Sequence, residues 1–487
     1  MRDVHLPSLR ARFRTSAIGG WGIALSLWVL CASPSAHAAG LQMAGHGVRG
    51  LARAGAFTAG GDDPGGIWYN PANIGGVEGI QLLVDASFVL LHLEYQRVDS
   101  GGNLLPPINA GGSKLPIPTV GLATSLLKRK LSLGFSFSAP YSPLPVYPEP
   151  NYAPCADPAN PVGCIATAHA DAPQRYTLVS TEGTMFLQLD LAAAYEVWRG
   201  LWVGASLQNL FASYITRNTI SSYNGALSSG PEDPEFDSLS QTELIDLFNP
   251  SAKFGVLYQP HPMVRIGASV QLPFWIGGEA TVKVQLPTSP VYEKSSVEGD
   301  RADMEVTFPL VLRLGVELRP MAGLRVEVGF DYEMWSMLQA IKVTPQNIYI
   351  LDIPSVDRYK VPALEIPLNF RNTFTLRLGG EYTLQPFPLT LRGGFIFERG
   401  AVEGEYASVL ALDSDKYMLT LGLGYSLFGY RLDLLYAHEF KPERVVDFRE
   451  SKSMQINPIN PAGAVGVGGG SYRSSTDVIG VGLSKTF

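Results

Sequence analysis

Apolar and polar residues alternate with a period of two along most of this chain, from Gly79 to its last residue. The clearest stretches, 417–427 and 430–440, alternate large apolar or aromatic residues with mostly small or charged ones. A period of two puts successive side chains on opposite faces of a β-strand. The sequence therefore predicts an all-β fold with fourteen strands, at 79–98, 116–127, 130–141, 184–197, 201–214, 252–259, 264–284, 303–319, 324–344, 364–384, 389–400, 415–428, 430–442 and 475–487.

The connections between these strands are alternately short and long. Lys128-Arg129 and Gly429 are complete short connections, whereas 142–183 and 443–474 are long ones. Outer-membrane barrels have short periplasmic turns and long outer loops, with aromatic girdles at both interfaces. Alternation alone would also fit a soluble sandwich, but the connections favour a 14-stranded antiparallel transmembrane β-barrel. In this arrangement Phe308, Leu312 and Leu314 belong to one row that faces lipid.

The N-terminus has the features of a secretory signal peptide. Three arginines precede an apolar stretch at 17–30, and Ala36-His37-Ala38 is an A-x-A cleavage site. We expect residues 1–38 to be removed, with a membrane anchor as the alternative. Their removal takes away four Arg and one Asp, which leaves 33 basic and 43 acidic side chains and a net charge of −10. This charge argues against nucleic acid as a partner.

A small, Gly-rich stretch at 50–74 lies between the signal peptide and the first strand. A short helix at 51–57 is compatible with its length, but its glycines make a lone helix weak. Asp62-Asp63-Pro64-Gly65 and Asn70-Pro71 are typical of turns. Such a stretch cannot bury a core of its own and needs a preformed cavity. We therefore expect residues 39–77 to form a plug inside a barrel of residues 78–487.

Several motifs resemble those of a known family. Arg53, Gly55 and the triplet Asn70-Pro71-Ala72 resemble the N-terminal hatch of the FadL-type outer-membrane transporters (the FadL/TodX/OmpP1 family). Residues 330–336 and the hairpin at 372–395 are similar to strands of the same family, and the likeness covers nearly the whole mature chain. Asn73 departs from the family pattern, which usually has Gly there.

The resemblance implies a function and a location. The family is found in the outer membrane of Gram-negative bacteria as a multi-pass β-barrel, and a monomer is expected. Its members carry hydrophobic molecules such as long-chain fatty acids or hydrocarbons passively, by lumenal binding and lateral release into outer-membrane lipid. A structural or adhesion barrel without transport is the alternative.

The third strand is where this resemblance places the lateral gate, at Ser136, Ser138, Ala139 and Pro140. Proline cannot donate to a β-ladder, so strand pairing should weaken at Pro140. The small serines leave room for the hatch, and we expect the triplet Asn70-Pro71-Ala72 to lie against this strand.

Arginines on the polar rows are the candidates for binding cargo. Arg313, Arg377 and Arg392 should face the lumen, where one of them could hold a fatty-acid carboxylate with two parallel hydrogen bonds. The alternative is that they neutralise a set of inward acidic residues, Glu317, Glu381, Glu398 and Asp433. Residues 237–248 could form an apolar helical face in an outer loop, either lining an access groove or capping the barrel.

Two cysteines remain after signal cleavage. Cys155 and Cys164 lie in a Pro-rich stretch, and in an exported protein this spacing indicates a disulfide that closes a loop. A metal pair would need further ligands, which the neighbouring sequence lacks. No convergent nucleophile and base is found, so we expect neither an enzyme nor a cofactor nor a metal.

Overall fold

The wall of the barrel consists of long antiparallel strands in the order that the sequence predicts. The computed structural model describes residues 43–112, 116–141, 145, 147, 172–225, 229–353 and 356–487. The signal peptide and the pair Cys155 and Cys164 lie outside these ranges and stay predictions. The spanning strands are β1 (Ile80–Arg97), β3 (Ile117–Leu126), β4 (Leu131–Ser138), β5 (Met185–Trp198), β6 (Leu201–Ser221), β7 (Asp237–His261), β8 (Val264–Gln271) continued by β9 (Phe274–Gln285), β11 (Arg301–Phe308) continued by β12 (Val311–Met321), β13 (Leu324–Glu333) continued by β14 (Ala340–Pro345), β17 (Leu364–Pro367) continued by β18 (Thr373–Leu384), β19 (Leu389–Glu398), β20 (Lys416–Leu427), β21 (Tyr430–Phe440) and β23 (Gly470–Thr486).

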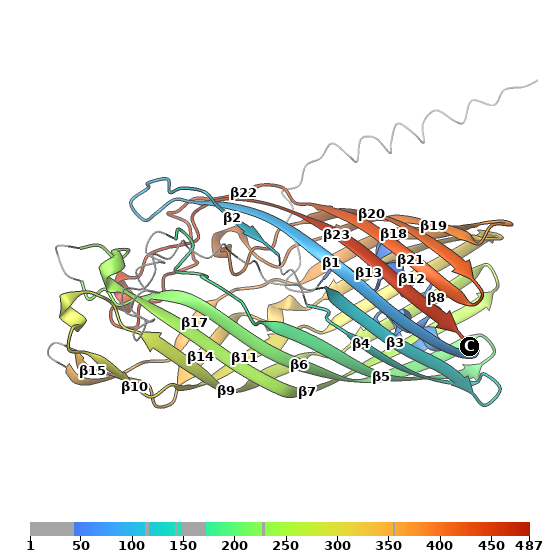
Figure 1. The fold of residues 1–487 in the computed structure, drawn as a ribbon, viewed down its shortest axis with the longest axis horizontal. Coiled ribbons are helices and arrows are strands. Elements are labelled where there is room, and N and C mark those ends of the chain that lie inside the picture. Colours follow the sequence, from blue (N-terminus) through green and yellow to red (C-terminus); the bar gives the residue numbers. More distant parts are fainter. Residues whose placement is uncertain are drawn as a thin grey trace, which may run out of the picture. The chain divides into compact units, whose positions relative to one another are not determined.

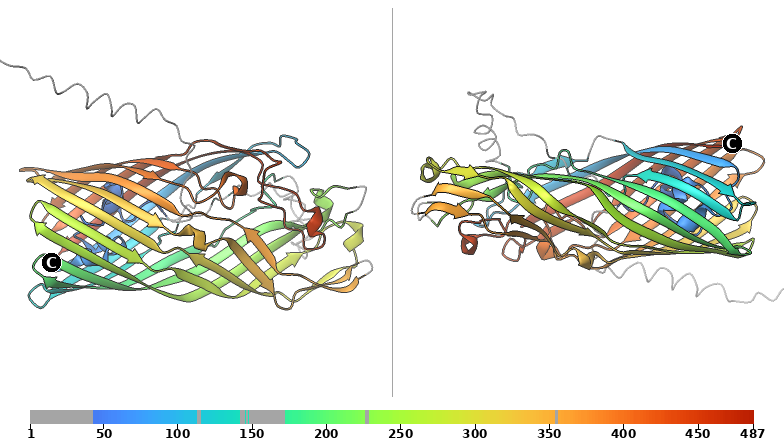
Figure 2. Two further views of the ribbon diagram at one scale, coloured as in Figure 1. Left: turned by 180° about the vertical axis from the view of Figure 1, so that it is seen from behind. Right: turned by 90° about the horizontal axis from the view of Figure 1, so that it is seen from below.

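The fourteen spanning strands close on themselves. Each pairs with its neighbours in the chain, and β1 pairs with β3 on one side and with β23 on the other. Short turns gather at the end where the C-terminus lies, and the long connections gather at the opposite end (Figures 1 and 2). The predicted all-β, 14-stranded barrel is confirmed.

Smaller elements decorate this wall. β2 (Ile108–Gly111) pairs with β1, and β22 (Arg444–Val446) pairs with β23. β10 (Ser296–Glu298), β15 (Tyr349–Ile353) and β16 (Val356–Lys360) form a separate three-stranded sheet. The outer connections contain short 3-10 helices, η3 (Pro234–Phe236), η4 (Pro290–Tyr292), η5 (Trp335–Met337), η6 (Gly404–Tyr406) and η7 (Pro461–Gly463). No helix among the described residues is both long and apolar enough to cross a membrane.

Before the first strand, the chain forms three short helices. They are α2 (Val48–Ala52), η1 (Pro64–Trp68) and η2 (Pro71–Ile74). The helix expected at 51–57 is thus shifted towards the N-terminus and ends at Ala52, because Ala54 and Gly55 adopt positive φ angles of 56° and 65°. This segment, blue in Figure 2, lies within the barrel in both views, towards the end that carries the short turns.

Four strands are interrupted at one level of the wall. The breaks fall at Leu272-Pro273, at Pro309-Leu310, and at 334–339 and 368–372. Each of the first two breaks shifts the alternation of inward and outward side chains by one residue. Inward positions are therefore odd-numbered in β8 and β12 but even-numbered in β9 and β11. A shift of one residue exchanges the two faces of a strand. The expectation that Phe308 faces lipid with Leu312 was therefore wrong, and Phe308 is buried in the lumen.

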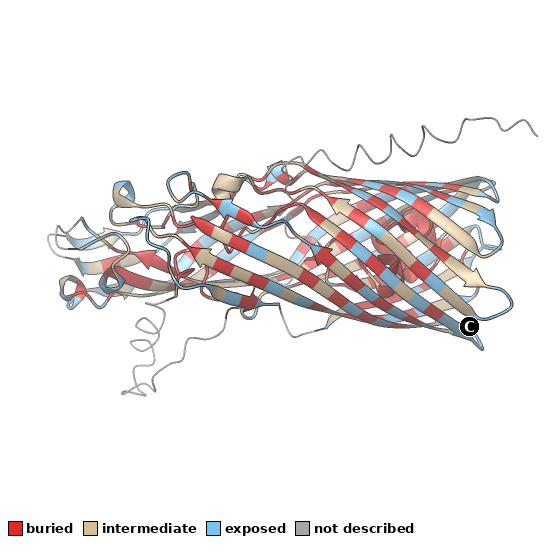
Figure 3. Ribbon diagram, turned by 90° about the horizontal axis from the view of Figure 1, so that it is seen from above, coloured by how far each residue is buried: buried red, intermediate tan, exposed pale blue. Residues whose placement is uncertain are grey.

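This reversal divides the lumen into two zones. Towards the short turns, lipid-facing positions are apolar and most inward positions are polar, charged or small. Figure 3 shows how buried and exposed positions alternate along these strands. Beyond the breaks, the outward positions of β9, β11 and β14 carry charges such as Glu279, Arg301 and Lys342. Their inward positions are apolar there, namely Phe274, Ile276, Ala280, Val282, Ala302, Met304, Val306, Phe308, Ile341 and Val343.

The expectation of an apolar loop helix at 237–248 was wrong. These residues form the outer half of β7, which pairs with β6 from Asp237 to Asp246. The clustered Leu and Ile residues do fit a helical face, but tertiary pairing with β6 decides the conformation.

Candidate functional site

The N-terminal segment fills the polar zone of the lumen. Nearly every residue from 44 to 74 is buried, although the segment has little apolar core of its own. The segment packs directly against glycines on inward positions of the wall. A Cβ added to any of these glycines would collide with the segment. These glycines come from ten strands: Gly121, Gly134, Gly204, Gly255, Gly267, Gly315, Gly379, Gly394, Gly422 and Gly480.

The triplet Asn70-Pro71-Ala72 starts η2 and anchors it to the wall. The Asn70 Oδ1 atom accepts a hydrogen bond from Ala72 N at 3.0 Å, while Asn70 Nδ2 donates to Val256 O on β7 at 3.0 Å. A Cβ added to Gly204 on β6 would lie 2.4 Å from Ala72 N. The triplet therefore contacts β6 and β7, and the expectation that it lies near Ser138 was wrong.

Buried arginines of the segment pair with carboxylates of the wall. Arg53 Nη2 lies 2.8 Å from Glu317 Oε2, and both side chains are fully buried. The same guanidinium lies 3.8 Å from Glu327 and 3.6 Å from Glu381. Arg49 binds Glu381 at 2.8 Å and also contacts Asp62. Removing one partner of such a network is costly, since it leaves an uncompensated buried charge.

The environment of the segment shifts its titrating groups. Burial lowers the pKa of His46 to about 4, so its ring is neutral near pH 7, and it lies 3.0 Å from the Thr119 hydroxyl. Burial alone would raise the pKa of Asp62, but Arg325 and Arg49 outweigh it and hold that pKa well below the ordinary value. Arg49 and Arg431 likewise keep the pKa of Asp63 low despite its burial.

The three arginines expected to face the lumen do so, and all are buried. Arg377 donates to Asp331 at 2.9 Å and to Ala44 O, and Arg392 donates to Glu381 at 3.0 Å and Asp433 at 2.7 Å. Arg313 differs, because none of its guanidinium nitrogens has a hydrogen-bond partner among the described residues. It lies over the Trp68 ring at 4.4 Å and 3.9 Å from Asp331.

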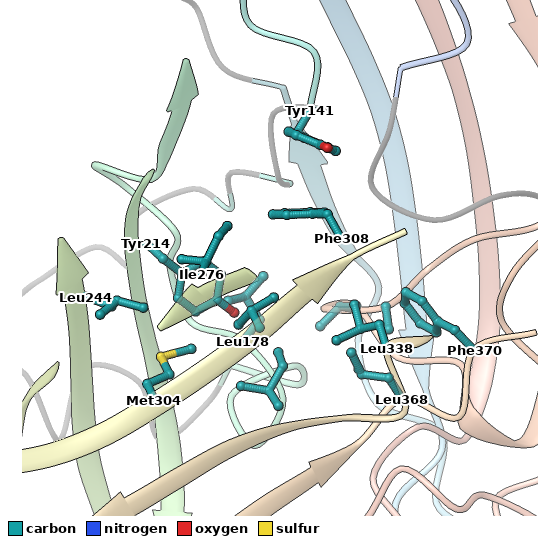
Figure 4. Close-up of a cluster of buried hydrophobic side chains, with 14 of the residues drawn as sticks. Tyr141, Leu178, Tyr214, Leu244, Ile276, Met304, Phe308, Leu338, Leu368 and Phe370 are labelled. Carbon is teal, nitrogen blue, oxygen red and sulfur yellow. The ribbon is translucent and has the colours of Figure 1, made fainter. Parts of the chain in front are cut away.

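Two neighbouring cavities lie in the apolar zone. One has almost wholly apolar walls, formed by Phe186, Tyr214, Leu244, Ile276, Val306, Phe308, Leu338, Ile341, Leu368, Phe370, Leu410 and Ala411. Figure 4 labels some of these side chains, namely Tyr214, Leu244, Ile276, Phe308, Leu338, Leu368 and Phe370. Tyr141 stacks on Phe308 with 4.0 Å between the ring centroids. The second cavity, of about 120 Å³, shares Phe370, Leu410 and Ala411 with the first. The residues that the two cavities share are apolar.

Charged side chains also line the second cavity. Lys416 and Lys441 lie among its lining residues, together with apolar ones such as Val89, Leu91 and Met418. Lys416 Nζ lies 2.8 Å from Glu398, and Lys441 Nζ lies 2.9 Å from Glu439. Burial raises the pKa of Asp413, which also lines the cavity, to about 6. These charged groups can receive the polar group of an amphipathic ligand.

Among the described residues, the β-ladder of the wall is interrupted beside the third spanning strand. β4 ends at Ser138, and β3 pairs with β1 only from Ile80 to Ser87. Beyond this level, no strand of the described residues joins β2 to β5. Met43 N donates to Pro140 O at 3.1 Å, so the N-terminal segment reaches this gap. Ser136 and Ser138 are buried, and their hydroxyls have no hydrogen-bond partner among the described residues.

Comparison with known proteins settles the family. A family model described as outer membrane protein transport protein (OMPP1/FadL/TodX) matches residues 159–465, well over half of the chain. This chain belongs to that family. The match confirms the resemblance seen in the sequence motifs and the location in the outer membrane. A comparison with curated proteins by sequence found no match.

Solved structures of the OMPP1/FadL/TodX family share the fold. A Pseudomonas aeruginosa FadL homologue has a TM-score of 0.70 and 17% identity, over 92% of this chain and 100% of its own. The Ralstonia pickettii toluene transporter TbuX gives 0.55 and 17%, and the P. putida toluene transporter TodX gives 0.57 and 16%. Each covers 91% of this chain and 99% of its own.

The cavity residues of this family member were not identified from its sequence. The inward orientation of Phe308 and Ile276 could not be predicted, because the inward and outward faces reverse at Pro309 and Pro273. The prolines themselves were a usable signal, since proline is confined to edges, strand ends and bulges of a sheet. Lys416 and Lys441 lie near the ends of predicted strands, where no pattern distinguishes a lining residue. The described residues contain no group of three His, Cys, Asp or Glu side chains placed to hold a metal ion.

Proposed function

We propose that this protein carries hydrophobic small molecules, long-chain fatty acids or hydrocarbons, passively across the outer membrane. Residues 39–77 would act as the hatch and residues 78–487 as the barrel. The observation that carries the proposal is the pair of cavities with largely apolar walls, which lie in the lumen beyond the polar zone that the N-terminal segment fills. A watery pore offers an apolar solute no favourable surface, whereas burial contributes about 25 cal/mol per Å² of apolar area.

Cargo would leave sideways through the wall beside β4. The gap beside Ser138 lies close to Met43, and Met43 also lines the second cavity. A molecule bound there could reach lipid without crossing the polar zone that the hatch occupies. Ser136, Ser138, Ala139 and Pro140 are the residues proposed to form this gate.

For a fatty acid, we propose two places that could receive the carboxylate. Lys416 and Lys441 line the second cavity directly, although each already has a carboxylate partner. Arg313 lacks such a hydrogen-bonded partner among the described residues, so it is the strongest of the three arginine candidates. Arg377 and Arg392 are better explained as members of the hatch network, since their hydrogen bonds go to the protein.

The cavities favour transport over a purely structural barrel. A structural barrel would gain from ion pairs throughout its lumen, whereas here they concentrate around the hatch and give way to an apolar zone. Filling the shared wall with Ala411→Trp should strongly reduce uptake of labelled palmitate and naphthalene, because Ala411 lines both cavities. Ala462→Trp, in an exposed loop, is the matched control and should transport normally. Undiminished uptake by Ala411→Trp would contradict lumenal binding.

A further inference from the structure

The β-ladder of the wall is open between β7 and β9. Pairing of β7 with β8 runs to Lys253 opposite Gln271, and Leu272 N still donates to Ala252 O at 2.9 Å. It resumes only at Glu243 opposite Thr281. Between these points, residues 244–251 of β7 and 273–280 of β9 share no backbone ladder. We call this stretch the β7–β9 seam.

Side chains bridge the seam in place of the ladder. Gly277 N donates to Asp246 Oδ2 at 3.2 Å, and the Ser251 hydroxyl donates to the carbonyls of Leu272 and Pro273, both at 3.0 Å. The cause is local. β7 bulges against β6 between Asp246 and Asn249, and Pro273 starts the reversal of faces on the other side. Side-chain bridges of this kind can open without breaking a row of backbone hydrogen bonds.

Apolar surface lies on both sides of the seam. Leu244 and Ile276, one from each edge, line the apolar cavity inside the barrel. Directly along the same two edges, four large side chains point outwards and are exposed: Ile245 by 57%, Leu247 by 61%, Phe248 by 77% and Trp275 by 62%. Exposed apolar side chains of this kind fit contact with lipid. Only the thickness of one sheet separates this patch from the cavity.

The seam lies at the outer border of the lipid-facing surface. Towards the short turns, the outward residues Phe254, Val256 and Ile266 are apolar and exposed, as lipid contacts should be. Towards the long connections, the outward residues Glu279 and Arg301 form an ion pair at 3.6 Å. The patch is therefore continuous with the region of the outer-leaflet acyl chains.

We propose that the β7–β9 seam is a second lateral opening, through which uncharged apolar molecules dissolved in the outer leaflet reach the cavity. The inference rests on the proposed transport function. It specifies the class of molecule, because the carboxylates of Asp246 and Glu279 both belong to the seam and disfavour an anion. The opening is distinct from the proposed gate beside β4, and the cavity lies between them.

A reversible lock across the seam tests the proposal. Asp246→Cys combined with Gly277→Cys places two thiols where side chain and backbone already touch. Val316→Cys with Val328→Cys, directly opposed where β12 and β13 are fully paired, is the matched control. Uptake of labelled naphthalene and palmitate is measured in cells that carry the full protein, before and after oxidation, with oxidised and reduced wild type beside them.

Oxidation of the seam pair should slow naphthalene uptake several-fold and leave palmitate uptake nearly unchanged, and reduction should restore the rate. The control pair should show no such effect. As a second variant, Leu247→Ser with Phe248→Ser should slow naphthalene uptake, whereas Leu104→Ser with Val445→Ser, exposed elsewhere on the outer side, should not.

The outcomes separate the seam from transport itself. Normal naphthalene uptake in both the locked and the serine variants would overturn the seam while leaving transport intact. Wild-type protein that takes up neither compound would overturn the proposed function, and the seam with it.

Discussion

Arg53 joins the proposed hatch to the wall through fully buried ion pairs. Its guanidinium faces Glu317, Glu327 and Glu381, and replacing it with Met leaves these carboxylates short of positive charge. Losing one partner of a buried ion pair costs about 3–5 kcal/mol. We therefore expect Arg53→Met to release the hatch in a fraction of molecules, which planar-bilayer recordings should detect as ion conductance.

A surface pair gives the control for this change. Arg129 binds Glu78 at 2.8 Å, but both side chains are more than half exposed. Exposed pairs contribute about 0–1 kcal/mol. The ion conductance of Arg129→Met should therefore be as low as that of the wild type. Equal conductance in Arg53→Met and Arg129→Met would mean that the buried network does not hold the hatch.

His46 should make hatch docking sensitive to pH. Its pKa falls from 6.5 to about 4 on burial, so the undocked state binds more protons between these values. Docking is therefore fully stabilised above pH 6.5 and weakens as the pH falls towards 4, by about 3 kcal/mol in total. Wild-type conductance should rise as the pH is lowered through this window.

A neutral substitute should remove that response. In His46→Gln the side chain can still bond Thr119 but takes up no proton, so its conductance should vary less with pH. His261→Gln, at an exposed turn, should keep the wild-type profile. Identical profiles for His46→Gln and wild type would assign the pH response to other groups.

At the level of single residues, the alternation was enough to place Arg313, Arg377 and Arg392 inside the barrel. It was not enough to choose their partners. Arg53 pairs with Glu317 across 264 positions of sequence, and this contact exists only because the hatch docks in a closed barrel. Nor could spacing alone show that Arg313 would lack the hydrogen bonds that Arg392 makes.

Among the elements, the short strand β4 borders the proposed release route. Ser138 is its last residue and is buried beside the gap in the wall. A bulky Ser138→Trp side chain should fill the gap and slow uptake of labelled palmitate, whereas Ser138→Ala should transport normally. Heat-modified migration on gels should show both barrels folded. Normal transport by the folded Trp variant would contradict release beside β4.

The strands illustrate what periodicity can and cannot predict. Strands such as β20 and β21 match their predicted ranges closely, because their alternation is unbroken from end to end. The predicted strand at 303–319 is instead two segments with opposite inward faces, since Pro309 interrupts the ladder. That break creates the apolar zone, so the cavity depends on a strand interruption that the regular alternation did not reveal.

For the whole molecule, the two zones of the lumen have separate tasks in this account. The polar zone binds the hatch and excludes ions, and the apolar zone binds cargo. The order of strands was predictable because local patterns repeat along the chain. The cavities were not, because residues as distant as Phe186 and Ala411 meet only after the barrel closes.

The most direct test records both tasks in the same reconstituted vesicles. The wild-type protein should admit labelled naphthalene faster than protein-free vesicles do, while staying closed to ions. Deleting residues 41–75 should open an ion-conducting pore, because the hatch no longer fills the polar zone. A deletion variant that stays non-conducting, together with wild-type vesicles that admit naphthalene no faster than empty ones, would contradict the account.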